Sequence, residues 1–427
     1  MDLSRFIKIY PGADASDLVL VYSTLRGTLL QVSRSVADSL RSRTLKGPEQ
    51  EVMAMLGILV PDAEAEKRQV AGYFNWVNAN ARRFTALVAL NPGRSSCHGE
   101  PSGGETGMDG ATADLLVEKI LKGPIASGRE VLLEFHGGEA LQSIPLIRRI
   151  AAPLHEAAAA NNTGFSFNLF SDGTQLTREV VEELLPPGLA GARVTITGPE
   201  VDAVILNNIR SVCDLIKVRL VGRFTRENHR RFPELLDQME QAGILPEMLQ
   251  TVQFLPVIPG SEAGGSGHFP MGCACGWEEW QTEAALQLRG EILKRGWNTP
   301  KPKLADCMVE FENDLVVTCD GTLYKCPAFS GCDDLKVGSL AGGIGDYRKS
   351  YFLDVWRNGK CLECSYLPLC FGGCRFMRRL RSGAIDGVDC RKEYFDAVLE
   401  RIVRQDIELR RSSYREAGSA PKPADTA

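Results

Sequence analysis

The sequence has no apolar run long enough to cross a membrane and no strong excess of either charge. Among its 427 residues, no stretch approaches the ~20 apolar residues that a membrane helix needs. The N-terminal residues Met-Asp-Leu-Ser-Arg-Phe show no apolar segment behind a basic start, so we expect no secretory signal. The net charge of −5 does not suggest a nucleic-acid-binding surface. We therefore expect a cytoplasmic protein that binds neither membranes nor nucleic acids.

Cysteine, by contrast, is plentiful and concentrated in the last third of the chain. Thirteen cysteines in a chain without a secretory signal favour metal or cluster ligands in a reducing compartment over a disulfide scaffold. Five of them fall within thirty residues, which is more thiolate than one four-coordinate site uses. Two iron–sulfur clusters account for this number better than one zinc ion. A zinc ribbon with spare buried cysteines is the alternative.

Between residues 83 and 260, strand-like apolar runs alternate with helical patterns. Six strands are predicted, at residues 84–90, 131–135, 165–170, 193–197, 218–221 and 252–257. Repeated βα units of about thirty residues indicate a parallel sheet with right-handed crossovers. Such sheets bind ligands at the carboxyl ends of their strands, so we expect a site in the loops that follow them.

The cysteine spacing resembles the SPASM domain, the auxiliary-cluster module of many radical S-adenosylmethionine (SAM) enzymes that modify peptides. The matching pattern is Cys-x13-Gly-x4-Cys, then Cys-x2-Cys-x5-Cys-x3-Cys, then a last cysteine, over residues 307–390. The resemblance implies two [4Fe-4S] auxiliary clusters whose ligands are interleaved in sequence. One would be held by Cys361, Cys364, Cys370 and Cys390. The other would be held by Cys307, Cys326 and Cys374, with Cys319 or a substrate group as its fourth ligand.

Turns after the predicted strands resemble the SAM site of the same family. Gly137, Gly138 and Glu139 follow the second strand, where the family has the motif that binds the SAM amino group. The glycines allow the backbone to approach a ligand closely, and the carboxylate can accept hydrogen bonds from an amine. Ser171 follows the third strand and resembles the ribose-side turn. Arg219 on the fifth strand would face the SAM carboxylate.

The resemblance implies an α/β fold class: a partial (β/α)6 radical SAM barrel between a small N-terminal α+β domain and a C-terminal cysteine-rich SPASM domain. The N-terminal strands are predicted at residues 6–9, 18–22 and 28–32, with a helix at 63–82 leading to the barrel. This unit resembles winged-helix-like leader-peptide recognition domains, and a capping role is the alternative. The expected units are 1–80, the barrel at 81–260, a linker with a helix at 261–303, the SPASM domain with a C-terminal helix at 304–412, and a disordered tail at 413–427.

The loop after the first strand departs from the family pattern. Radical SAM enzymes of this type hold their SAM-binding cluster with Cys-x3-Cys-x2-Cys at this place. Here residues 91–99 contain Cys97 alone, and one thiolate does not hold a [4Fe-4S] cluster. Either the loop is degenerate or a local deletion has altered an otherwise active enzyme. SAM and a third cluster are therefore expected only if this loop functions.

These observations lead to two functional hypotheses. The first is a maturase that modifies a ribosomally made peptide or protein by SAM-derived radical chemistry, an oxidoreductase-type reaction. It would need a peptide or protein substrate and an electron donor such as flavodoxin or ferredoxin. The second is a catalytically inactive family member that binds peptide or transfers electrons through its SPASM clusters. The sequence does not identify a catalytic residue.

Overall fold

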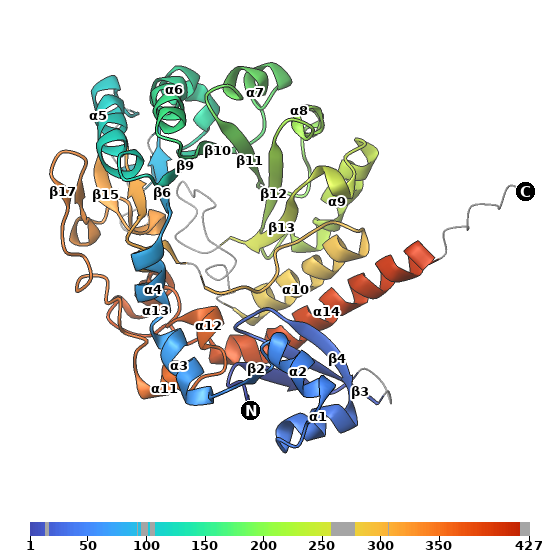
Figure 1. The fold of residues 1–427 in the computed structure, drawn as a ribbon. Coiled ribbons are helices and arrows are strands. Elements are labelled where there is room, and N and C mark those ends of the chain that lie inside the picture. The colour runs from blue at the N-terminus through green and yellow to red at the C-terminus, as the bar shows by residue number, and fades with distance from the viewer. Residues whose placement is uncertain are drawn as a thin grey trace, which may run out of the picture.

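A computed structural model describes residues 1–12, 17–91, 93–94, 101–102, 107–257, 278–305 and 307–418. For residues 93–94, 101–102 and 410–418 it describes the backbone alone. One large curved sheet runs through this part of the chain, and helices cover its outer side (Figure 1). Within the described ranges, no helix is both long and apolar enough to cross a membrane.

Ten strands form the large sheet, in the order β13-β12-β11-β10-β9-β6-β14-β15-β16-β17. Six of them are the strands that the sequence predicts, and each pairs in parallel with its neighbour among the six. They are β6 (Arg83–Ala89), β9 (Glu130–His136), β10 (Phe165–Ser171), β11 (Leu189–Ile196), β12 (Lys217–Phe224) and β13 (Thr251–Pro256). The prediction of an α/β fold with a large, mostly parallel sheet is therefore confirmed.

Helices follow the strands and pack on the outer face of the sheet (Figure 1). They are α5 (Gly110–Ile120), α6 (Ile144–Ala160), α7 (Arg178–Leu184), α8 (Ala203–Val212), α9 (Pro233–Gln241) and α10 (Glu279–Lys294). In α6 the buried residues include Ile147, Ile150 and Leu154, a spacing that places them on one helical face. The side chains of Asp109 and Thr177 accept backbone N–H bonds at the starts of α5 and α7.

The sheet continues beyond the barrel into the cysteine-rich region, which the sequence did not predict. Strand β14 (Asp314–Val317) pairs in parallel with β6. The strands β15 (Thr322–Tyr324), β16 (Gly338–Ser339) and β17 (Gly343–Ile344) then follow in antiparallel pairs. The expected boundary near residue 304 therefore separates two parts of one sheet.

Four α-helices follow β17 in the described chain: α11 (Gly359–Leu362), α12 (Leu367–Cys370), α13 (Arg375–Ser382) and α14 (Lys392–Gly418).

The N-terminal unit contains the expected hairpin and third strand. Strands β2 (Ile7–Tyr10), β3 (Leu18–Ser23) and β4 (Leu29–Ser33) form an antiparallel sheet. Around it lie β1 (Asp2–Leu3), β5 (Leu59–Val60), α1 (Arg34–Arg41) and α2 (Pro48–Met55). Leu20 and Tyr22 of β3 belong to one buried cluster with Phe395, Leu399 and Val403 of α14. The unit is therefore packed against the C-terminal helix.

Two helix boundaries differ from the sequence prediction. The helix expected at 63–82 is divided at Gly72 into α3 (Ala63–Ala71) and α4 (Tyr73–Asn80), because glycine stabilises a helix interior poorly. At the other end of the chain, α14 continues to Gly418, whereas a disordered tail was expected from residue 413. Residues 413–417 include the good helix formers Arg, Glu and Ala, which explains the extension. Residues 419–427 lie outside the described part.

Helices α10 and α14 lie side by side and are joined by two ion pairs of different character (Figure 1). Arg289 of α10 pairs with Asp406 of α14 at 2.6 Å, with side-chain exposures of 10% and 8%. Arg401 of α14 pairs with Glu283 of α10, also at 2.6 Å, but the exposures are 48% and 59%. Loss of one partner leaves a buried charge only in the first pair.

Asp406→Ala should therefore lower the free energy of unfolding by about 3–5 kcal/mol, because Arg289 would stay buried without its acid. Glu283→Ala removes an exposed acid from the same helix pair and should cost about 0–1 kcal/mol. Urea unfolding followed by circular dichroism measures both. Equal losses would show that burial of the Arg289–Asp406 pair is not what holds the two helices together.

Candidate functional site

Glu139 connects the loops that follow β9 and β10. Its Oε2 accepts hydrogen bonds from Ser171 Oγ at 3.0 Å and from the backbone N–H of Asp172 at 2.7 Å. Its Oε1 accepts the backbone N–H of Leu141 at 3.0 Å, at the start of the short 3-10 helix η2 (Ala140–Ser143). The residue is 7% exposed, and burial raises the pKa of Glu139. Two predicted SAM-site residues, Glu139 and Ser171, are thus brought into contact.

The two predicted glycines have different surroundings. Gly137 has a φ of 104°, and a Cβ placed on it would lie 2.4 Å from the carbonyl oxygen of Asn91. Gly138 has a φ of 54° and is exposed, and apart from its chain neighbours no described residue has an atom within 4 Å of an added Cβ. Asn91 Nδ2 donates to the carbonyl of Glu139 at 3.0 Å. Gly137 is therefore needed for contact with the preceding loop, while Gly138 has no such close contact in the described part of the chain.

The loop that would carry the SAM cluster begins at Asn91, beside these glycines. Short strands β7 (Gly93–Arg94) and β8 (Pro101–Ser102) pair within it. Cys97 lies outside the described residues, as do Cys273 and Cys275 of the linker.

The seven thiols of the SPASM-like pattern fall into two groups. Cys307 and Cys326 interact electrostatically with each other and with Cys374. In a separate group, Cys364 and Cys390 raise the pKa of Cys361, and Cys361 raises the pKa of Cys370. Cys364 and Cys390 also raise the pKa of Lys392 in α14. No three His, Cys, Asp or Glu side chains in the described ranges lie close enough to hold a single metal ion. A cluster, in which each thiolate binds a different iron, suits more widely spaced thiols.

Buried charges surround the three-thiol group. Arg375 donates to Glu310 at 2.5 Å, and both side chains are buried. The Lys325 ammonium group, also buried, donates to the carbonyls of Phe311 and Asp314. Burial raises the pKa of Cys307 to about 12, so the thiol is neutral at pH 7 and must lose its proton to bind metal. The three thiols therefore suit an iron–sulfur cluster, because its iron ions provide the positive charge that balances the thiolates.

Cys319 lies apart from both groups. It follows β14, and its thiol donates to the carbonyl of Ala89 at the end of β6, at 3.4 Å. Strand β15 (Thr322–Tyr324) then runs back antiparallel to β14, and Cys326 follows it after Lys325. The assignment of Cys319 as a fourth ligand stays a prediction.

The structure places the predicted arginine near the amino end of its strand. Arg219 is the third residue of β12; it is exposed, and its Nε donates to Gln250 Oε1 at 2.6 Å. Ligands of parallel sheets lie at the other end of the strands. Arg223, four residues further along β12, is buried near the carboxyl end, and the two-residue period of a strand places it on the same face as Arg219. The assignment of Arg219 to the SAM carboxylate stays a prediction.

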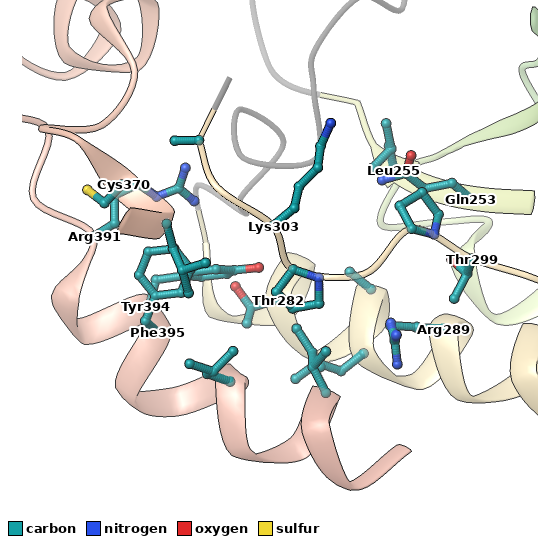
Figure 2. Close-up of a pocket in the computed structure, with 18 of the residues that line it drawn as sticks. Gln253, Leu255, Thr282, Arg289, Thr299, Lys303, Cys370, Arg391, Tyr394 and Phe395 are labelled. Atoms are coloured by element: carbon teal, nitrogen blue, oxygen red, sulfur yellow. The ribbon is translucent and has the colours of Figure 1, made fainter. Parts of the chain in front are cut away.

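A cavity of about 150 Å³ lies where the barrel meets the cysteine-rich region. Its walls come from β13, α10, residues 299–307 and α14. Cys307 and Cys374 of one thiol group and Cys370 of the other line it. Figure 2 shows Cys370 on one side of this cavity and Leu255 of β13 on the other. Both thiol groups therefore border the same space beside the barrel.

Comparison with known proteins identifies relatives in structure only. No protein-family model and no curated protein matches the sequence. Among solved structures, anSMEcpe with bound AdoMet matches with a TM-score of 0.53 at 14% identity, covering 76% of this chain and 100% of its own. SuiB of Streptococcus suis bound to its precursor peptide SuiA matches with a TM-score of 0.50 at 11% identity, covering 91% and 98%. This chain has their fold.

The loops that follow the strands share one location in this fold. In the matched structures the bound molecules are AdoMet and, for SuiB, a precursor peptide. In this chain the loops that carry Glu139 and Ser171 lie at the carboxyl ends of the barrel strands.

Gly137→Ala should lower the free energy of unfolding by about 2–4 kcal/mol, because it combines an unfavourable φ with a clash against Asn91. Gly138→Ala has a left-handed φ but no clash and should cost about 1–2 kcal/mol. Urea unfolding of both variants measures the difference. A Gly138→Ala loss as large as that of Gly137→Ala would contradict the close contact between the first two loops.

Proposed function

We propose that this protein has the site of a radical SAM enzyme of the SPASM type, which modifies a ribosomally made peptide or protein when its SAM-binding cluster is complete. The observation that carries the proposal is the division of the seven patterned thiols into a group of three and a group of four. This is the division that the resemblance implies, although Cys374 of the first group lies in sequence between Cys370 and Cys390 of the second. The Glu139–Ser171 contact at the carboxyl edge of the barrel supports the proposal independently.

The proposed ligands follow from these positions. Cys361, Cys364, Cys370 and Cys390 would hold one auxiliary cluster. Cys307, Cys326 and Cys374 would hold the other, whose fourth ligand would be Cys319 or a substrate group. SAM would lie against Gly138, with Glu139 and Ser171 fixing the shape of the loops around it. The chemistry that SAM and its cluster supply when bound is abstraction of a hydrogen atom from the substrate.

A second candidate function is favoured by the single cysteine of residues 91–99. One thiolate does not hold the cluster that cleaves SAM. The protein would then be an inactive partner that binds peptide or passes electrons through its two auxiliary clusters. The two candidate functions make different predictions for a protein whose loop 91–99 is given the missing cysteines. The maturase would then cleave SAM, whereas the inactive partner would not.

The test is SAM cleavage by the anaerobically reconstituted protein in the presence of a strong reductant. We expect no deoxyadenosine above background from the chain as it stands, because the loop offers one thiolate. Insertion of a Cys-x3-Cys-x2-Cys loop, with Cys97 as its last cysteine, should restore deoxyadenosine formation. The matched control is a loop of the same length in which serine replaces the two added cysteines.

Cleavage by the repaired loop but not by the serine control would support the maturase. A repaired protein that gains iron and still leaves SAM intact would rule it out and leave the inactive partner. Cleavage by the unaltered chain would show that residues other than the loop cysteines complete the cluster site.

A further inference from the structure

Arg375 connects two segments that carry thiols of the three-thiol group. It is the first residue of α13 and directly follows Cys374. Its Nη1 donates to the carbonyl of Gly373 at 3.4 Å, on the other side of that cysteine. Its Nη2 donates to the carboxylate of Glu310, whose backbone N–H donates in turn to the carbonyl of Cys307 at 3.0 Å. The guanidinium of Arg375 therefore lies between the backbone segments of Cys307 and Cys374.

Both partners of the ion pair between Arg375 and Glu310 are buried. Their side chains are 3% and 4% exposed. Nη2 of Arg375 also donates to the carbonyls of Phe352 and Leu353, at 3.3 and 3.4 Å. Burial raises the pKa of Cys307, and the positive charge of Arg375 opposes that shift. The charge of the guanidinium therefore acts on a thiol of the proposed cluster.

One N–H of this guanidinium has no partner. The Nε atom of Arg375 is buried and makes no hydrogen bond within the described part of the chain, although both Nη atoms are bonded. Buried donors in folded proteins are paired in the great majority of cases. A buried donor without an acceptor destabilises the fold, so we expect a bound group to supply the acceptor.

Sulfur is the acceptor that a cluster would bring to this place. An iron–sulfur cluster held by Cys307, Cys326 and Cys374 contains thiolate and sulfide sulfurs, which can accept an N–H hydrogen bond. Hydrogen bonds to these sulfurs are among the factors that set the reduction potential of a cluster. They favour the reduced state, because that state carries more negative charge.

We propose that Arg375 is a positioning residue for the cluster of the three-thiol group and raises its reduction potential. Through Glu310 it holds the segments of Cys307 and Cys374 together. Its Nε donates the remaining hydrogen bond to a cluster sulfur. This role rests on the auxiliary clusters of the proposed function and does not require SAM cleavage.

The first experiment is a potentiometric titration of the anaerobically reconstituted full-length protein, followed by electron paramagnetic resonance. Arg375→Lys keeps a positive charge that can pair with Glu310 but removes the Nε donor. The variant should retain about eight irons per chain, as the parent does. At the parent's midpoint potential, the ratio of reduced to oxidised cluster should fall about ten-fold, which is ~59 mV for a one-electron couple. The other auxiliary cluster should keep its potential.

Arg379→Lys is the matched control, because it makes the same substitution one turn further along α13. Arg379 pairs with Asp334 at 3.1 Å, and its side chain is 28% exposed. This variant should leave the iron content and both potentials unchanged. An equal fall in Arg379→Lys and Arg375→Lys, or full iron content with no fall in Arg375→Lys, would overturn the assignment.

A second experiment on the parent chain decides the case in which Arg375→Lys loses iron. The protein is produced with arginine that carries ¹⁵N at Nε, and its reduced clusters are studied by pulsed electron paramagnetic resonance. A hydrogen bond from Nε of Arg375 to a cluster sulfur gives a magnetic coupling between ¹⁵N and the cluster. The absence of this coupling would overturn the assignment, whatever the iron content of the variant.

The outcomes separate the role of Arg375 from the proposed function. If the ¹⁵N coupling is present but the protein with the repaired loop does not cleave SAM, the role of Arg375 stands and the maturase fails. If SAM is cleaved and the coupling is absent, the maturase stands and the role of Arg375 is wrong. A parent protein that binds no cluster at the three thiols would overturn both this role and the two-cluster account.

Discussion

Seven thiols lie in a C-terminal part of this chain that has little regular structure. Between residues 345 and 374 the described chain forms two helices, α11 and α12, of four residues each. Helices of this length are not stable alone. Cys361, Cys364 and Cys370 lie within or directly after them, so ligation of one cluster would join both helices to Cys390 at the start of α14. Metal binding of this kind contributes directly to the free energy of folding.

The register of β14 against β6 relates this region to the barrel. Because β14 is parallel to β6, the hairpin turn after it lies at the carboxyl edge. Gly138 and Glu139 lie at the same edge, in the loop that follows β9.

Local sequence patterns predicted the strands of the barrel well and the side chains inside it poorly. The six parallel strands coincide with apolar runs of the sequence, so apolar composition is enough to locate them. Gly72 divides a helix that composition alone would continue. The addition of β14 to the sheet depends on long-range pairing with β6, which no local pattern encodes. The predicted fifth strand, 218–221, stops before Arg223, whereas β12 extends to Phe224.

For the thiols, too, sequence spacing and three-dimensional structure provide different information. The number of cysteines within thirty residues favoured two clusters over one zinc site, while their grouping came from the resemblance to SPASM domains. The sequence offered Cys319 as a candidate fourth ligand. The structure places its thiol against the carbonyl of Ala89, at the carboxyl end of β6.

The most direct test of the account is the iron and sulfide content of the anaerobically reconstituted protein. Two clusters on the seven patterned thiols predict about eight irons per chain. Four irons or fewer, or zinc in their place, would contradict the two-cluster account. About twelve irons would instead contradict the inference that a loop with Cys97 as its one cysteine does not hold a third cluster.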